Sequence, residues 1–244
     1  MGAGALPQPS ARQREDRRLR NVSARAPLGV VTGLLEEAAI LAPVGARVRA
    51  CGARPGAAER LARTLADQGA RALMSFGMAG GLAPALRPGT LLLPRRIVAP
   101  GGGAYTVDEV WRAALAARAG AHEDGAIAGS DTVVRDVAAK AALHRATGAV
   151  AVDMESHEVA AVAAERGLPF LAVRAVADPW NRAIPSSALV GVSPDGARRP
   201  AAVMAALAVR PWQIVGLLVL ARDAGAATKT LRRVARLGPL AFGV

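Results

Sequence analysis

Residues 148–179 read GAVAVDMESHEVAAVAAERGLPFLAVRAVADP, and this stretch decides the fold. Two short apolar runs, 149–152 and 170–176, predict buried strands. Between them, the segment 156–166 has the composition and length of a helix. A strand, a helix and a second strand in this order are typical of a parallel sheet in which the helix covers one face.

Acidic residues follow each of these two strands. Asp153 and Glu155 come after the first strand, and Asp178 comes after the second. Burying an ionised carboxylate without a partner is costly, so acids at the ends of buried strands are candidates for holding a polar ligand or moving a proton. The alternative is that two of them cap helices and the third lies on the surface.

The same alternation extends through the rest of the chain. Further strands are predicted at 28–31, 48–51, 73–76, 91–93 and 126–128, and further helices from about 34, over 57–68 and over 107–117. The pattern predicts an α/β protein with three layers, α/β/α, around a mostly parallel central sheet. Ligands of such sheets bind beyond the carboxyl ends of the strands. The polar turns at 32–33, 75–77 and 130–131 fall at that edge, together with the acids.

Composition excludes several classes of protein. The chain has 244 residues and one cysteine, Cys51, which excludes an internal disulfide and fits a cytoplasmic protein. No apolar run has the ~18–20 residues needed to span a bilayer. The charge of +12 lies at the two ends: residues 1–26 carry six Arg against two acids, and residues 198–244 carry seven Arg and one Lys against one acid. A near-neutral body with basic ends is unlike a domain that binds nucleic acid through its folded face.

Three segments follow from this distribution. Residues 1–26 have no hydrophobic period and are expected to form a disordered basic tail. Residues 27–209 are expected to form the folded domain. Residues 210–244 are expected to form a basic amphipathic helical segment.

Four motifs resemble the nucleoside phosphorylase and nucleosidase superfamily, over about residues 28–183. They are VVTGLLEEAAIL, MSFGMAGGLAPALRPGTLLLP, GSDTVV and VAVDMESHEVAAVAAERGLPFLAVRAVADP. Within the superfamily, SFGMAGGLAPALRPG, VDMESHEVA and the extension DPWNRAIPSSALVGVSPDG look most like the hopanoid-associated phosphorylases. That resemblance implies a nucleoside phosphorylase-like fold. It also implies that phosphate cleaves the N-glycosidic bond of adenosylhopane, in hopanoid biosynthesis, which releases adenine and phosphoribosyl-hopane.

Two alternatives remain open. One is a hydrolytic methylthioadenosine/adenosylhomocysteine nucleosidase. The other is a non-catalytic basic protein that binds a membrane or nucleic acid through its two ends. The resemblance implies no cofactor and no metal, with inorganic phosphate as co-substrate, and it implies a homo-oligomer. The expected partner is a lipophilic adenosine-type nucleoside, and no nucleic acid.

The resemblance also implies roles for individual acids. Glu155 would bind the ribose 2′- and 3′-hydroxyls, and Met154 would form an apolar wall of the sugar pocket. Asp178 would donate a proton or a hydrogen bond to N7 of the leaving purine. Glu37 matches the carboxylate that activates water in the nucleosidases. The alternatives are a turn cap for Asp178 and first-turn helix acids for Glu155 and Glu37.

The remaining implied positions surround the nucleophile and the base. Ser75, Gly33 and Gly77 lie where the superfamily holds phosphate or water, while Val133 and Val134 lie where it contacts the base. Val133 replaces the stacking Phe of the nucleosidases. No Arg lies in the Gly-rich turn, and Arg71 and Arg174 could replace it or form structural ion pairs.

The C-terminal segment permits two interpretations. Residues 212–221 are almost continuously apolar, and Lys229, Arg232, Arg233 and Arg236 then alternate with apolar residues at helical spacing. Such a helix could lie on an anionic membrane, which would place the protein peripherally at the inner membrane face. Alternatively, it packs on the domain or forms a dimer interface.

Overall fold

The computed structural model describes residues 27–42, 46–52 and 54–238. The tail expected at 1–26 lies outside these residues. The described chain forms one mixed sheet of nine strands. Their bounds are β1 (Leu28–Thr32), β2 (Arg47–Ala50), β3 (Ala72–Gly81), β4 (Leu91–Leu92), β5 (Arg96–Val98), β6 (Ala104–Thr106), β7 (Ile127–Gly129), β8 (Ala151–Asp153) and β9 (Phe170–Asp178).

Parallel pairing dominates the sheet, as the alternation of strands and helices predicts. The strand order is β2-β1-β3-β8-β7-β5-β6, and β9 pairs with both β3 and β4. The pairs β1–β2, β1–β3, β3–β9, β5–β7 and β7–β8 are parallel. The pairs β3–β8, β4–β9 and β5–β6 are antiparallel. The prediction of a mostly parallel α/β sheet is therefore confirmed.

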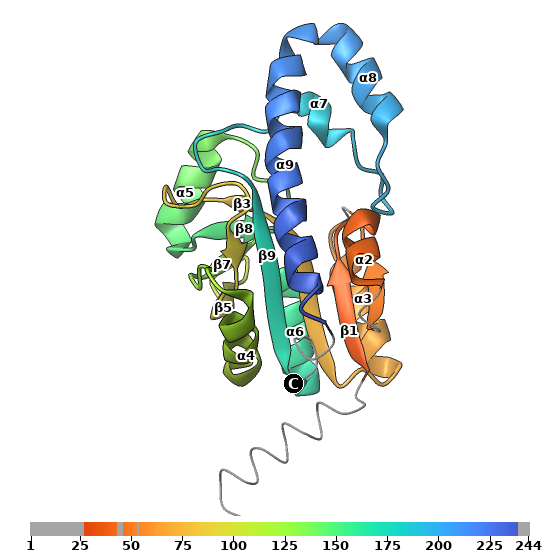
Figure 1. Cartoon of the computed structure of the whole chain (residues 1–244), viewed down its shortest axis with the longest axis vertical. Helices are drawn as coiled ribbons and strands as arrows, with labels where there is room; N and C mark the ends of the chain where they lie inside the picture. Colours follow the sequence, from red (N-terminus) through yellow and green to blue (C-terminus); the bar gives the residue numbers. More distant parts are fainter. Residues whose placement is uncertain (1–26, 43–45, 53, 239–244) are drawn as a thin grey trace, which may run out of the picture.

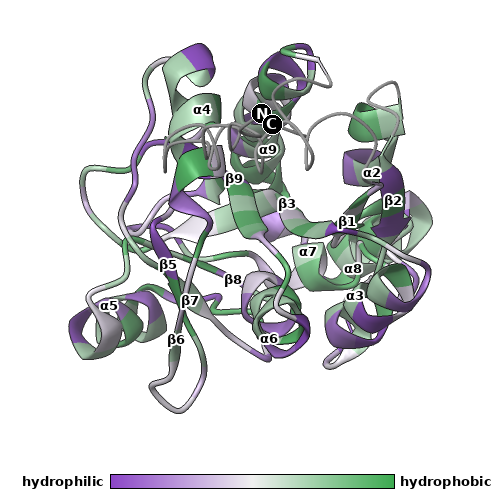
Figure 2. Cartoon of the chain, turned by 90° about the horizontal axis from the view of Figure 1, so that it is seen from below, coloured by the Kyte–Doolittle hydropathy of each residue, from purple (hydrophilic) through white to green (hydrophobic). Residues whose placement is uncertain are grey.

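Helices cover both faces of this sheet (Figure 2). On one face α3 (Ala57–Asp67) and α6 (Ser156–Arg166) pack against each other and against the central strands. On the other face α2 (Leu35–Leu41) and α9 (Ile214–Ala235) pack together, and α9 lies along β9 (Figure 1). The remaining helices are α4 (Glu109–Ala119), α5 (Val137–Thr147), α7 (Ser186–Leu189), α8 (Pro200–Val209) and the 3-10 turn η2 (Pro211–Gln213).

The long helix α9 has two halves with different surroundings. Its second half contributes Ala227, Leu231, Val234 and Ala235 to the hydrophobic core. These are residues of the segment for which the sequence left membrane contact or packing on the domain open, and they pack on the domain. The first half of α9 projects beyond the sheet beside α8 (Figure 1).

The structure differs from the sequence-based prediction at two places that concern the site. The Gly-rich segment 77–82, predicted as a turn, continues as strand to Gly81, because Gly80 and its neighbours pair with β9. Helix α5 was not predicted at all. The described part of the chain contains no helix long and apolar enough to cross a membrane.

Candidate active site

Arg174 lies at the centre of a buried group of polar side chains. It belongs to β9, where it lies opposite Gly77 of β3, two positions along from Ser75, and its side chain is 1% exposed. Nε of Arg174 lies 2.8 Å from Oδ2 of Asp153, and Nη2 lies 3.1 Å from Oε2 of Glu155. Nη2 also donates to Oγ of Ser75 at 2.5 Å and to Oγ of Ser156 at 3.1 Å. From the middle of β9, the guanidinium thus joins the carboxyl end of β8 to β3.

Glu37 joins the same group from the first turn of α2. It is 3% exposed, and each of its carboxylate oxygens accepts a backbone hydrogen bond. Oε2 accepts from the amide of Leu34 at 2.9 Å, and Oε1 accepts from the amide of Met78 at 2.8 Å. The first bond stabilises the start of the helix, and the second fixes the carboxylate beside β3. The interpretation of Glu37 as a solvated helix acid is therefore wrong.

Two glycines leave the space that these acids occupy. A carbon added as Cβ at Gly33 would lie 2.8 Å from Oε1 of Glu155. At Gly77 the added carbon would lie 2.7 Å from Oε1 of Glu37 and 2.8 Å from Nη1 of Arg174. Gly33, Gly77 and Ser75 thus line the same group as Glu37 and Glu155, and we call it the carboxylate cluster: Glu37, Ser75, Asp153, Glu155, Ser156 and Arg174.

The carboxylate cluster holds three acids around one guanidinium. Burial raises the pKa of Glu155 to about 7; Arg174 opposes this shift, whereas Asp153 and Glu37 add to it. Burial also raises the pKa of Glu37, again against the effect of Arg174. With three carboxylates and one guanidinium in a buried space, the cluster favours the binding of a proton or of other positive charge.

Asp178 lies at the end of β9, next to a bulge. The register of β9 against β3 shifts after Ala79, so that Gly80 is opposite Asp178 rather than Ala177. Bulges re-aim side chains near sites of function. The carboxylate of Asp178 lies close to the Cα of Gly80, where an added Cβ would be 3.3 Å from Oδ2.

The partner of Asp178 is Lys140, which the sequence did not indicate. Nζ of Lys140 donates to Oδ2 of Asp178, to the carbonyl of Pro179 at 2.9 Å and to the carbonyl of Arg182 at 3.0 Å. The Lys140 side chain is 0% exposed. Burial raises the pKa of Asp178, and Lys140 is the main influence that lowers it.

The other predicted residues lie around this core to different degrees. Met154 and Glu155 line a small hollow with Cys51, Gly52 and Asp131. Val134 packs against the small apolar cluster that contains Val152. Val133 is 44% exposed. The structure therefore brings together Glu37, Glu155, Gly33, Gly77 and Ser75. Asp178 pairs with Lys140 at the end of β9, outside this group, and Val133 is on the surface.

His157 lies nearby but is engaged elsewhere. It is buried, and Nε2 lies 3.3 Å from Oδ1 of Asp131. Asp131, His157 and Glu158 could offer three metal-ligand atoms within 4.8 Å of one another. The Glu158 carboxylate, however, accepts from the amides of Gly56 at 2.6 Å and Glu59 at 3.0 Å, which makes it a cap for α3.

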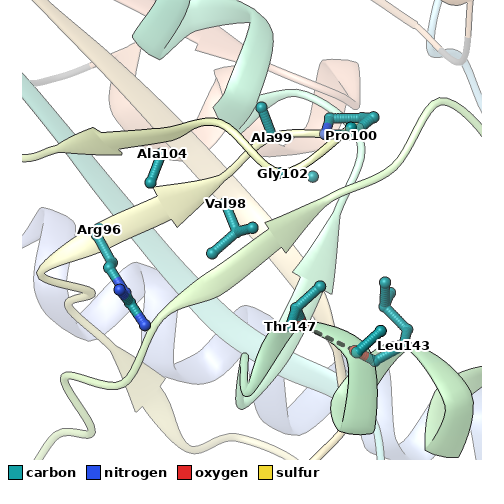
Figure 3. A pocket seen from close by; sticks show the side chains of 11 residues that line it. Arg96, Val98, Ala99, Pro100, Gly102, Ala104, Leu143 and Thr147 are labelled. Carbon is teal, nitrogen blue, oxygen red and sulfur yellow. Dashed lines mark hydrogen bonds between the residues drawn. The ribbon is translucent and has the colours of Figure 1, made fainter.

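A separate hollow of about 460 Å³ lies between the hairpin of β5 and β6 and the end of α5 (Figure 3). It is lined by Arg96 and by mainly apolar or glycine residues, among them Val98, Pro100, Leu143 and Thr147. None of the predicted site residues lines it.

Lys140 shows what sequence reasoning missed and which signal was available. The chain contains only two lysines, Lys140 and Lys229, against many arginines. Lys140 is the one lysine in the near-neutral body. Its place in that body was the signal available, although Lys229, the other lysine, is exposed.

Comparisons with known proteins identify the family and the fold. A family described as the phosphorylase superfamily matches residues 11–209. The comparison with curated proteins gave no significant match.

Solved structures with a similar fold include two nucleosidases and a futalosine hydrolase. A 5′-methylthioadenosine/S-adenosylhomocysteine nucleosidase from Helicobacter pylori superposes with a TM-score of 0.64 at 16% identity, covering 87% of this chain and 98% of that one. The nucleosidase from Streptococcus pneumoniae with 8-aminoadenine has a TM-score of 0.58 at 19% identity, covering 64% and 87%. Futalosine hydrolase from H. pylori has a TM-score of 0.57 at 19% identity, covering 63% and 88%.

Proposed function

Since the chain belongs to the phosphorylase superfamily and is an enzyme that cleaves N-glycosidic bonds of nucleosides, we propose that its substrate is adenosylhopane. Adenosylhopane is an adenosine with a very large apolar 5′ substituent. The observation that carries the reaction type is the buried carboxylate cluster with Asp178 on the same strand as Arg174. The identity of the 5′ substituent comes from the sequence resemblance to the hopanoid-associated phosphorylases.

The carboxylate cluster suits the sugar half of the reaction. When the bond between C1′ and N9 breaks, its electron pair leaves with the base and positive charge develops at C1′ and the ring oxygen. Glu155 would accept hydrogen bonds from the ribose 2′- and 3′-hydroxyls and place negative charge beside that centre. Met154 would form the apolar wall.

Asp178 suits the base half of the reaction. Protonation of N7 makes adenine a neutral leaving group, so the electron pair from C1′–N9 does not build up as charge. Asp178 is buried, and its raised pKa favours the protonated form that this step requires. Lys140 would return a proton to the site or hold the carboxylate in place.

For the nucleophile, the geometry favours water. Glu37 would take the proton of an attacking water, and its burial, which raises its pKa, supports this role. Arg174 is the one cation of the cluster, and its N–H groups are already used by Asp153, Glu155, Ser75 and Ser156. Three carboxylates in the same space would repel a phosphate dianion.

Phosphorolysis is the second candidate, and the extension after Asp178 favours it. The segment DPWNRAIPSSALVGVSPDG resembles the hopanoid-associated phosphorylases. In this case a phosphate oxygen would bond to C1′, and the product would be phosphoribosyl-hopane.

The test is adenine release by the purified protein from adenosylhopane in detergent and from methylthioadenosine, each with and without phosphate. Release from adenosylhopane that Asp178→Asn lowers by about 10²–10⁴-fold would support the proposal. The matched control is Asp67→Asn, since Asp67 forms a surface ion pair with Arg166. Release from methylthioadenosine alone would contradict the lipid substrate. A requirement for phosphate would select the second candidate.

A further inference from the structure

Residues 197–222 form a helical projection that the rest of the described chain leaves uncovered (Figure 1). We call this segment the apolar arm; it comprises α8, η2 and the start of α9. None of its residues is buried, and the first buried residue after it is Asp223. Helix α8 has the sequence PAAVMAALAV, without one polar side chain. A helix with no polar side and no buried residue has no favourable orientation toward water.

The most exposed apolar side chains gather at the outer end of the apolar arm. Val209 is 68%, Trp212 72% and Val215 66% exposed. Gln213 points inward instead, where its side chain bonds to the backbone amide of Ser187 at 3.0 Å. Gln213 is the one uncharged polar side chain of the apolar arm. Because it bonds to Ser187, it leaves the outer surface of the arm apolar. Contiguous exposed apolar surface of this kind marks an interaction site.

The charge of the apolar arm has a single sign. Residues 196–222 contain four arginines and no acidic residue. Arg198 pairs with Glu36 at 2.6 Å, whereas Arg199, Arg210 and Arg222 form no ion pair with any described residue. These three arginines flank the two apolar helical stretches, and Arg210 is next but one to Trp212. Arginine and tryptophan beside apolar side chains are typical of the interface between lipid headgroups and acyl chains.

We propose that the apolar arm inserts into the surface of an anionic lipid bilayer. Val209, Trp212 and Val215 enter the acyl boundary, and the unpaired arginines contact lipid phosphates. The arm does not cross the bilayer, because its two apolar stretches are too short to span it. This assignment places the membrane contact in residues 197–222, which include the apolar run 212–221 of the sequence-based hypothesis but not its basic residues 229–236.

The base of the apolar arm lies at the carboxylate cluster. The carbonyl of Gly196 accepts from the amide of Leu35 at 3.2 Å, and a Cβ added at Gly196 would lie 2.7 Å from the carbonyl oxygen of Gly33. The loop before the arm therefore covers the edge of the site next to Glu155. Helix α8 connects this loop to the outer end of the arm, where the bilayer would bind. The proposal rests on the exposure and charge of the arm, and it does not depend on the identity of the nucleoside.

The experiment is co-sedimentation of the full chain with vesicles of phosphatidylcholine alone and of phosphatidylcholine mixed with phosphatidylglycerol. We expect binding to the anionic vesicles, weaker binding at high salt, and little binding to the neutral ones. The double variant Val209→Ser/Val215→Ser should bind about tenfold more weakly or worse, because it removes apolar area from the contact. The matched control is Val110→Ser/Val137→Ser, at two exposed valines of α4 and α5.

A second readout separates a lipid partner from a second copy of the chain. Quenching of Trp212 by brominated lipid, lost in Trp212→Phe, would support insertion. The proposal is overturned if anionic vesicles do not bind the protein, or if the control variant loses as much binding as the arm variant. It is also overturned if light scattering shows that Val209→Ser/Val215→Ser only converts an oligomer to monomers.

Discussion

The ammonium group of Lys140 and the carboxylate of Asp178 form an ion pair inside the protein, and Lys140 is fully buried. Two opposite influences act on Asp178: burial raises its pKa, and Lys140 lowers it. Lys140 also donates to the carbonyls of Pro179 and Arg182, so its ammonium group satisfies two backbone acceptors in the segment that follows β9. Asp178, the proposed acid for the leaving group, is thus positioned by Lys140 of α5, which also lowers its pKa.

Replacing Lys140 by Met should raise the pKa of Asp178 further, because the main opposing influence is removed. If protonated Asp178 is the acid, kcat/KM falls as pH rises through its pKa. That fall should move to higher pH in Lys140→Met. The measurement is the pH profile of kcat/KM. The control is Lys229→Met, at the exposed lysine of α9, which should leave the profile in place.

Lys140→Met should also lower the free energy of unfolding by about 3–5 kcal/mol near neutral pH, because it leaves a buried carboxylate unpaired. The double variant Lys140→Met/Asp178→Asn removes both charges and should recover most of that loss. Urea denaturation of the single and double variants measures both effects. Equal stability of the two variants would show that the pair is not the reason for the loss.

Glu37→Gln separates the two candidate nucleophiles. Attack by water needs a base, so kcat should fall by about 10²–10⁴-fold. Phosphate is already an anion and needs no base, so phosphorolysis should change by less than about tenfold. The control is Glu36→Gln, whose carboxylate pairs with Arg198 on the surface. Steady-state kinetics with and without phosphate gives the answer.

The pKa of Glu155 predicts how stability depends on pH. It is raised from 4.5 to about 7 in the folded protein, so the folded state holds a proton that the unfolded state has lost. This contribution is fully present below about pH 4.5 and is lost as pH rises through about 7. Glu37 and Asp178 act in the same direction, because their pKa values are also raised.

Glu155→Gln should therefore flatten the decline in the free energy of unfolding between pH 5 and pH 8 by on the order of 2 kcal/mol. Denaturant titration at both pH values measures the slope. Glu165→Gln serves as the control, because Glu165 is an exposed partner of Arg63 with a lowered pKa. A slope as steep in Glu155→Gln as in the parent protein would show that other groups hold the proton.

Much of the fold followed from local patterns. Strands β1, β8 and β9 were predicted from their apolar residues, although Arg174 lies within β9 and both β8 and β9 end in an aspartate. Helix α5 was missed because VAAKAALHRAT lacks a clear apolar stripe. Its lysine is buried by a contact with Asp178, 38 residues away. A pairing of that kind depends on tertiary structure and leaves no local spacing to detect.

The contacts of Arg174 also could not be predicted from local sequence patterns. The sequence left open whether it holds phosphate or forms a structural ion pair. Its ion pairs with Asp153 and Glu155 depend on β8 and β9 lying on either side of β3. The antiparallel contact of β8 with β3, confined to Gly80 and Gly81, could not be read from an alternation that predicts parallel neighbours.

Gly33→Ala tests whether glycine is needed at position 33 to leave space for the Glu155 carboxylate. Its added carbon would lie 2.8 Å from Oε1 of Glu155 and 3.6 Å from Oε2 of Glu37, so the Glu155 carboxylate, the proposed ligand of the ribose, must move. Because a displaced carboxylate loses its aligned hydrogen bonds to the ribose, kcat/KM should fall by about tenfold or more. The free energy of unfolding should fall by about 1–3 kcal/mol, as in other overpacked sites. Gly103→Ala is the matched control, since no atom lies within 4 Å of an added carbon there. Equal kcat/KM values for the two alanine variants would show that catalysis does not depend on the position of the Glu155 carboxylate. Glu155 would then not bind the ribose.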